Sequence, residues 1–275
     1  MPPVKISLDG LTLEVPALPL TRFSFAPFGD VIQNPHPTIA PSPSLPRTLS
    51  LNALAANQGT AIKYQHPSTP RDLYAQAPSG TPARAVVNMF VCAARPLEQP
   101  APASPPPIST LLPYGPGHRG GAGLFDVSIL ERHPFTTQTF VPMGAPHGAA
   151  YLVIVAPSLP PSSRDEGLPA PKEEAGAQGK ARLPGRGLPD LRRLQAYVAS
   201  GDQAVTYGAG TWHAPMVALG HPGTAIEFVV TQFANDVGIE DCQEVVFGGS
   251  EGDGRIVVKV PERPMLPDRA ALSKL

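Results

Sequence analysis

The chain has 275 residues, a length that fits one large domain or two small ones. Its formal net charge is −1 and it has no block of basic residues, which excludes the electrostatic surface that nucleic acid or an anionic membrane requires. Charged residues make up only 16%, whereas 37 prolines and 26 glycines exceed ordinary usage, so part of the chain is expected to lie in loops.

The N-terminal segment MPPVKISLDGLTLEV lacks a basic region followed by an apolar run, so we expect no signal peptide. The longest apolar run, AAYLVIVA at 149–156, is too short to cross a bilayer. Cys92 and Cys242 lie far apart in the sequence and form no CxxC pair, which favours reduced thiols over a disulfide. The sequence therefore predicts a cytoplasmic protein without a membrane partner.

Period-two alternation of apolar and polar residues predicts strands along most of the chain. In chain order these stretches lie at 4–19, 25–33, in a stretch that ends with NALAANQGTAIKY at 64, and at 83–94, 123–143, 149–156, 204–219, 224–235 and 254–260. The stretch 189–199 differs, because Leu191, Leu194 and Val198 recur near helical spacing after Pro189 and Asp190, which predicts a helix. The expected fold class is mainly β, with one or two short helices.

Two long connections, 95–121 and 157–188, are rich in Pro, Gly, Ser and Ala and have no apolar periodicity. Loops of this length are uncommon within a compact domain and are usually functional or disordered. We predict that both are surface insertions in a single domain that spans 1–275, with solvated filler as the plain alternative. The second is expected to be a mobile excursion that a short linker could replace.

One stretch, LERHPFTTQTFVPM, combines an acid, an imidazole and an amide between strand-forming residues. Strand alternation puts four residues on one face: Phe125, Val127, Ile129 and Glu131. Three of the four are apolar, which marks this face as inward. His133 follows on the same side and Gln138 begins the next strand. A buried carboxylate needs a partner, a metal or a substrate to offset its desolvation.

The spacing of Glu131, His133 and Gln138 resembles the first motif of the cupin barrels, H-x-H-x₃₋₄-E, and the stretch GAGTWH, which ends at His213, resembles the second, P-x-G-x-x-H. Cupins are jelly-roll β-barrels that commonly hold a divalent metal, for which imidazole and carboxylate are suitable ligands. The resemblance implies a cupin-like β-barrel with these four residues as candidate metal ligands. Glu131 and Gln138 depart from the motif, and a hydrogen-bonded core residue is the alternative for any one of the four.

Longer stretches resemble the ureidoglycolate lyase family, also called ureidoglycolate hydrolase: FAPFGDVI, NQGTAIKY, LERHPFTTQTFVPM, PDLRRLQAYVASGDQAVTYGAGTWHAPM and FVVTQFANDVGIEDCQEV. The similarity covers about 20–66, 84–95, 123–156 and 189–247 and omits both Pro-rich insertions. It implies a cupin-like enzyme, often a homodimer, that cleaves ureidoglycolate into glyoxylate and urea in allantoin and purine catabolism. Some members are reported to use nickel.

This reaction requires a base, an acid or a metal, and a cation for the substrate carboxylate. We expect His213 to be the base or a ligand, because the unperturbed pKa of histidine lies near neutrality. Glu131 is expected to position an imidazole or a metal, or to act as an acid once desolvation raises its pKa. Lys63 is the first choice for the carboxylate. Arg132 is the second, with a solvated or interface arginine as the alternative.

Further residues are candidates for binding the substrate. Asn57, Gln58 and Thr60 could hydrogen-bond the ureido group, unless they only shape the turn around the intervening glycine. Gln138 and Tyr207 are also candidates, with a place in the barrel wall as the alternative for Tyr207. Two other functions remain open: another metal-dependent cupin enzyme, which the amide at position 138 disfavours, and a non-catalytic cupin that binds a small molecule.

Overall fold

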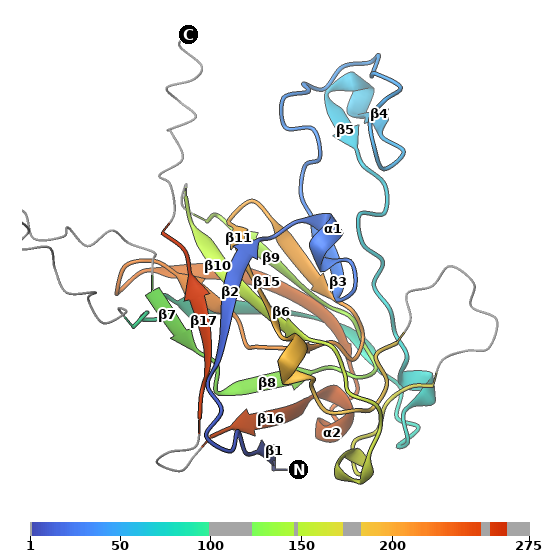
Figure 1. The fold of residues 1–275 in the computed structure, drawn as a ribbon. Coiled ribbons are helices and arrows are strands. Elements are labelled where there is room, and N and C mark those ends of the chain that lie inside the picture. The colour runs from blue at the N-terminus through green and yellow to red at the C-terminus, as the bar shows by residue number, and fades with distance from the viewer. Residues whose placement is uncertain (1, 99–122, 146–147, 173–182, 249–253, 263–275) are drawn as a thin grey trace, which may run out of the picture.

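The structure, a computed structural model, describes residues 2–98, 123–145, 148–172, 183–248 and 254–262. Figure 1 shows a β-rich body with very short helices. The strands are β1 (Val4–Ile6), β2 (Leu13–Pro19), β3 (Gly29–Ile32), β4 (Leu54–Ala56), β5 (Ala61–Lys63), β6 (Arg84–Ala93), β7 (Gly123–Asp126), β8 (Ile129–Arg132), β9 (Gln138–Met143), β10 (Ala150–Ala156), β11 (Gln195–Ser200), β12 (Ala204–Tyr207), β13 (Trp212–His213), β14 (Val217–Leu219), β15 (Ala225–Ala234), β16 (Gln243–Phe247) and β17 (Ile256–Val260). The helices are α1 (Arg22–Phe25) and α2 (Gly238–Asp241), and the 3₁₀ turns are η1 (Asn57–Gly59), η2 (Tyr74–Gln76), η4 (Ser163–Asp165) and η5 (Leu191–Arg193).

Two sheets form the body. The larger has the strand order β1-β16-β8-β13-β10-β11-β2-β17-β7, with β14 also paired to β10, and the smaller has the order β3-β12-β9-β15-β6. The larger sheet curls, so that β7 and β17 pack on the same apolar cluster as β8 and β10. The prediction of a mainly β, cupin-like fold with short helices is confirmed. No helix among the described residues is long and apolar enough to cross a bilayer.

Strand β10 shows how the sheets are held together. Its apolar run is buried along its whole length, because both of its faces are covered. Tyr151, Val153 and Val155 pack toward the smaller sheet, whereas Leu152 and Ile154 pack inside the curl of the larger one. Burial of such side chains contributes about 1.5–3 kcal/mol each, so this strand is the central element of the core.

The predicted helix at 189–199 is wrong. Only Leu191–Arg193 form a 3₁₀ turn, which the Asp190 side chain caps by accepting a hydrogen bond from the backbone N–H of Arg192. The following residues, Gln195–Ser200, form β11, which pairs with β10 on one side and β2 on the other. Ladder hydrogen bonds and burial between two strands outweigh a weak local preference for helix.

The predicted common face of Phe125, Val127, Ile129 and Glu131 is also wrong, because only Ile129 and Glu131 share a face of one strand. Strand β7 ends at Asp126 and β8 begins at Ile129, and the break between them shifts the alternation of side chains. Phe125 and Val127 therefore pack with Leu130 in the core of the curled sheet, whereas Glu131 points to the opposite side of β8.

A few residues in the described parts of 157–188 pack against the body, whereas many others are exposed. Leu168 and Leu188 belong to the core cluster of the curled sheet. Asp165 is fully buried, caps η4 with Ser162 and lies 3.1 Å from the guanidinium of Arg186. Residues 173–182, and most of the other predicted insertion at 95–121, lie outside the described residues.

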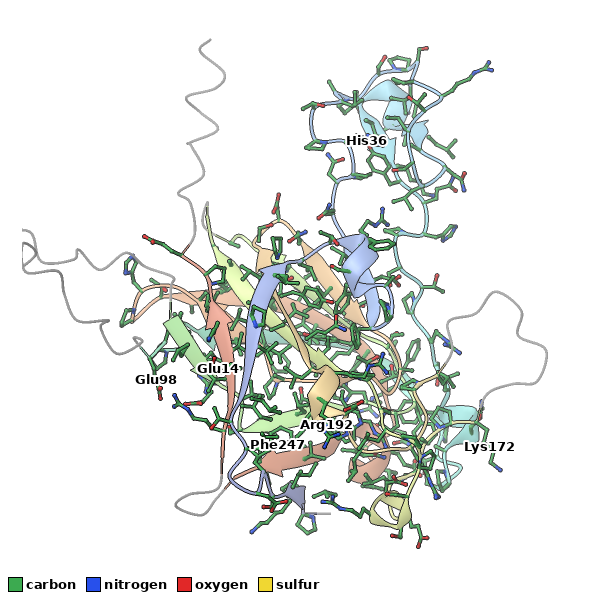
Figure 2. All side chains as sticks on the ribbon, viewed as in Figure 1. Glu14, His36, Glu98, Lys172, Arg192 and Phe247 are labelled. Carbon is green, nitrogen blue, oxygen red and sulfur yellow. The ribbon has the colours of Figure 1, made fainter. Side chains whose placement is uncertain are left out.

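Residues 34–70 form a segment that we call the arm. It carries the hairpin β4–η1–β5 and projects from the body beside α1 and β3 (Figure 1). His36, which Figure 2 labels, lies in this arm, well apart from the strands of the two sheets. None of the side chains of the arm is buried.

Candidate active site

Three predicted site residues meet between the two sheets. Glu131 on β8 and His213 on β13 are direct partners in an antiparallel ladder, and His133 follows the end of β8. The Oε1 atom of Glu131 lies 3.5 Å from Nε2 of His213, and the two imidazole rings are 5.5 Å apart. One ligand atom from each of the three residues lies within 4.8 Å of the others.

Backbone carbonyls orient both imidazoles. Nδ1 of His133 lies 2.6 Å from the carbonyl oxygen of Asp241, and Nδ1 of His213 lies 2.9 Å from that of Thr211. A carbonyl oxygen only accepts hydrogen bonds, so each Nδ1 carries the proton and each Nε2 presents a lone pair. Both Nε2 atoms are buried without a hydrogen-bond partner. Two such atoms beside one carboxylate form a site for a divalent cation with open positions.

Electrostatic interactions within the cluster favour an ionised Glu131, and the surroundings of His133 disfavour its protonation. Desolvation raises the pKa of Glu131, but the nearby imidazoles of His213 and His133 together lower it below its ordinary value. This contradicts our expectation that desolvation would raise the pKa of Glu131. Burial lowers the pKa of His133, an effect that the neighbouring His213 strengthens. The cluster thus combines a carboxylate with two imidazole nitrogens, a donor set suited to a divalent metal.

Tyr207 and Gln138 line the same space. The Tyr207 ring stacks on that of His213 at 3.9 Å, and burial raises the pKa of its hydroxyl well above its ordinary value. Gln138 is the ladder partner of Tyr207. Its Nε2 donates to Oε1 of Gln232 at 2.7 Å, which leaves its own Oε1 buried without a partner. Tyr207 therefore holds His213 in place, and Gln138 presents a free acceptor.

Arg132 is placed differently from both alternatives given by the sequence. It is fully buried, on the face of β8 opposite to Glu131. Its guanidinium donates to Oε1 of Gln243 and to the carbonyl oxygens of residues 185–187, and it lies 4.4 Å over the ring of Trp212. These contacts fix the last residues of the 157–188 segment to the larger sheet, so Arg132 has a structural position.

The structure does not bring the predicted residues of the arm to this cluster. Lys63 is exposed on β5, and Asn57, Gln58 and Thr60 are exposed in η1 and beside it. Asn57 and Gln58 have positive φ angles of 48° and 53°, and the Thr60 hydroxyl donates to the carbonyl of Asn57 at 2.8 Å. Within one chain these residues therefore shape a turn, whereas β8 lies far from β5 in Figure 1.

Sequence reasoning missed the position of Cys242, which we regarded as structural, and of Glu244. The Sγ atom of Cys242 lies 4.0 Å from Oε2 of Glu131, and Glu244 is the ladder partner of Glu131. These three residues form a second group whose ligand atoms are close together. Burial, with the charges of Glu131 and Glu244, raises the pKa of the Cys242 thiol to about 12, which favours the protonated sulfur at neutral pH. Both cysteines are free.

Comparison with known proteins decides the family. The sequence profile described as ureidoglycolate lyase matches residues 12–251. The chain belongs to the ureidoglycolate lyase family. It is 33% identical over 225 residues to a ureidoglycolate lyase of Schizosaccharomyces pombe, with 82% of this chain and 86% of that relative covered. It is 32% identical over 243 residues to one of Saccharomyces cerevisiae (87% and 96% covered) and 27% identical over 218 residues to one of Burkholderia mallei (79% and 81% covered).

Membership of the ureidoglycolate lyase family confirms the resemblance read from the sequence motifs and makes this chain a member of a family of lyases. The family profile spans the arm, the insertion at 157–188 and the whole Glu131–His133–His213 cluster.

Proposed function

We propose that this protein is a ureidoglycolate lyase that cleaves ureidoglycolate into glyoxylate and urea, with the cluster of Glu131, His133 and His213 as its reaction centre. The observation that carries this proposal is the pair of buried, unpartnered Nε2 atoms beside an ionised carboxylate, in a member of the ureidoglycolate lyase family. Unpaired buried polar atoms are costly, by about 1–3 kcal/mol each, and persist where a ligand satisfies them.

We propose that Nε2 of His133, Nε2 of His213 and Oε1 of Glu131 hold a divalent cation. The donor set fits such an ion, and nickel is the one that the family resemblance implies. A bound cation supplies Lewis acidity, which favours the loss of a proton from a coordinated hydroxyl group. The Nδ1–H bonds to the carbonyls of Asp241 and Thr211 fix both rings in the orientation that this coordination needs.

The reaction is the collapse of a carbinolamide. The hydroxyl O–H bond breaks, a C=O bond forms, the C–N bond breaks, and the leaving urea nitrogen gains a proton. We assign the proton transfer to Oε2 of Glu131, the carboxylate oxygen that faces away from His213, which takes the hydroxyl proton and returns it to nitrogen. The free Oε1 of Gln138 accepts a hydrogen bond from a ureido N–H and orients the leaving group.

The proposal includes a cation for the carboxylate of the substrate, and Lys63 in the arm is our candidate. It also includes a homodimer in the cytoplasm, as the family resemblance implies. Free thiols at positions 92 and 242 agree with a reducing compartment.

Purified protein is expected to release urea and glyoxylate in equal amounts from ureidoglycolate, to lose this activity after treatment with a chelator, and to regain it with added nickel. Activity that resists complete removal of the cation, checked by elemental analysis, would refute the metal assignment alone. If the metal-loaded protein releases no urea but still binds the substrate in calorimetry, the protein is a small-molecule-binding cupin instead of a lyase.

A further inference from the structure

The arm lacks the burial that normally holds a polypeptide segment in one conformation. None of residues 34–70 is buried, although the segment contains apolar side chains such as Leu54, Ile62 and Tyr64. Ordering a backbone costs about 1–2 kcal/mol per residue, and buried apolar surface is what usually offsets this cost. A surface outside the arm must therefore cover it.

This surface does not belong to the described body of the same chain. Every hydrogen bond and ring contact of residues 34–70 with described residues stays within the arm, for example those of His36 with Ser50 and Tyr64, and of Gln65 with Asn52. The arm stands clear of the sheets in Figure 2. Its folded shape is thus formed independently of the body, as in a segment that binds another molecule.

The arm is positively charged and has a constrained turn at its tip. It contains two cations, Arg47 and Lys63, and no acidic residue. Its tip holds three successive residues with positive φ, of which Asn57 and Gln58 are not glycine, and such backbone strain concentrates at functional sites. At Gly59, where φ is +91°, an added Cβ would lie 2.5 Å from the Pro43 ring, so the sequence is constrained to this turn.

In the part of the chain that the structure describes, the charged side chains that act on Glu131 in the candidate active site include no lysine or arginine that could pair with the carboxylate of a substrate. The charged groups that act on Glu131 are His213 and His133, and among the described residues no lysine or arginine joins them. Arg132 lies on the opposite face of β8 with its donors engaged. A substrate that carries a carboxylate needs a cation at such a site. The arm has cations and no acidic residue, so its charge is complementary to the carboxylate of the substrate.

The body has a surface on which a second copy of the chain can pack. Strand β6 is the edge strand of the smaller sheet, and its outward residues Val87, Met89 and Val91 are 72%, 59% and 64% exposed. Met89 and the exposed Val141 of β9 flank Val229 of β15 in the ladder, so the apolar face continues across three strands. Contiguous exposed apolar surface of this kind marks an interface.

We propose that two copies of this chain pair across the outer face of β6, β15 and β9, and that the arm of each copy brings Lys63 to the Glu131–His133–His213 cluster of the other. The reaction centre is then complete only in the dimer. This inference rests on the proposed lyase function, in which Lys63 binds the substrate carboxylate and raises affinity for it.

Complementation between two inactive variants tests the exchange of arms. Lys63→Ala and His213→Ala are each expected to lose most of the activity as homodimers. After subunit exchange in an equal mixture, half of the dimers are mixed and each holds one intact site, so activity should return to about a quarter of wild type. If the arm served its own chain, no site in the mixture would be intact, and the absence of any recovery would overturn the proposal. Unimpaired Lys63→Ala activity would also overturn it.

A second measurement does not depend on catalysis, so its failure is separate from failure of the lyase function. Gln58 is replaced by the photoreactive amino acid p-benzoylphenylalanine, and light and isotope-labelled copies are mixed before irradiation. We expect cross-links that join the arm of one isotopic form to peptides around residues 131–138 of the other. Cross-links confined to one chain would overturn the proposal. Met89→Glu should convert dimers into monomers in sedimentation, whereas Leu11→Glu, an exposed apolar site elsewhere, should not. A dimeric Met89→Glu protein would refute the pairing surface.

Discussion

Replacing Glu131 by glutamine probes the reaction centre at almost constant shape. The change removes the negative charge next to the two unpartnered Nε2 atoms and the oxygen to which we assign proton transfer. Loss of a positioned acid–base group lowers kcat by about 10²–10⁴-fold. This corresponds to a barrier increase of about 2.7–5.4 kcal/mol, at about 1.36 kcal/mol for each factor of ten.

The amount of bound cation should fall in the same variant. Weakening even an indirect partner of a metal ligand costs about 10–100-fold in affinity, so loss of an anionic ligand is expected to cost at least that much. Glutamine keeps the size of the side chain, so cooperative unfolding should be retained. The assays are initial rates of urea release, elemental analysis of the purified protein, and thermal unfolding of the same preparation.

Glu244→Gln is the matched control for this experiment. It makes the same chemical change at the ladder partner of Glu131, one strand away, in a residue that is exposed. We expect kcat and metal content close to wild type. An unchanged kcat in Glu131→Gln would refute the assignment of the reaction centre. A large loss in Glu244→Gln, together with a normal His133→Ala variant, would move the centre to the group of Glu131, Cys242 and Glu244.

Three further changes test the described structure. Arg132→Met should lower the free energy of unfolding by about 3–5 kcal/mol in chemical denaturation, because Gln243 and the carbonyls at 185–187 lose their buried donor. The control Arg193→Met, at an exposed position, should change this free energy by no more than about 0.5 kcal/mol. Leu168→Ala should cost about 2–5 kcal/mol by creating a cavity, and a neutral result would return 157–188 to the surface. Without metal, the protein should lose stability as the pH falls below about 6.5. Burial lowers the pKa of His133 in the folded state, so the unfolded chain binds the proton first as the pH falls. The melting temperature should therefore fall between about pH 8 and about pH 5, and a rise over this range would contradict the prediction.

The sequence by itself determined the fold class, the family and the three residues that meet at the centre. Strand periodicity is a local property that is written along the chain, and it predicted the strands around Glu131 and His213. The cupin-like spacing also identified His133, because a short motif on one hairpin keeps its residues together whatever the rest of the chain does. Gln138 was identified in the same way, and its free acceptor now has a place beside Tyr207.

Only the tertiary structure decided which way side chains point and which segments lie together. The stretch after Leu191 has a helical pattern but pairs as a strand, because neighbouring strands supply hydrogen bonds and burial that no local pattern encodes. Arg132 is adjacent to Glu131 in sequence yet lies on the other face and holds the chain at residues 185–187. The lowered pKa of Glu131 arises from two imidazoles brought to it by β13 and the end of β8. The arm keeps Lys63 far from the Glu131–His133–His213 cluster of its own chain. A hairpin that is stabilised only by internal contacts takes its position from the surface that packs against it, and the sequence of one chain does not specify that surface.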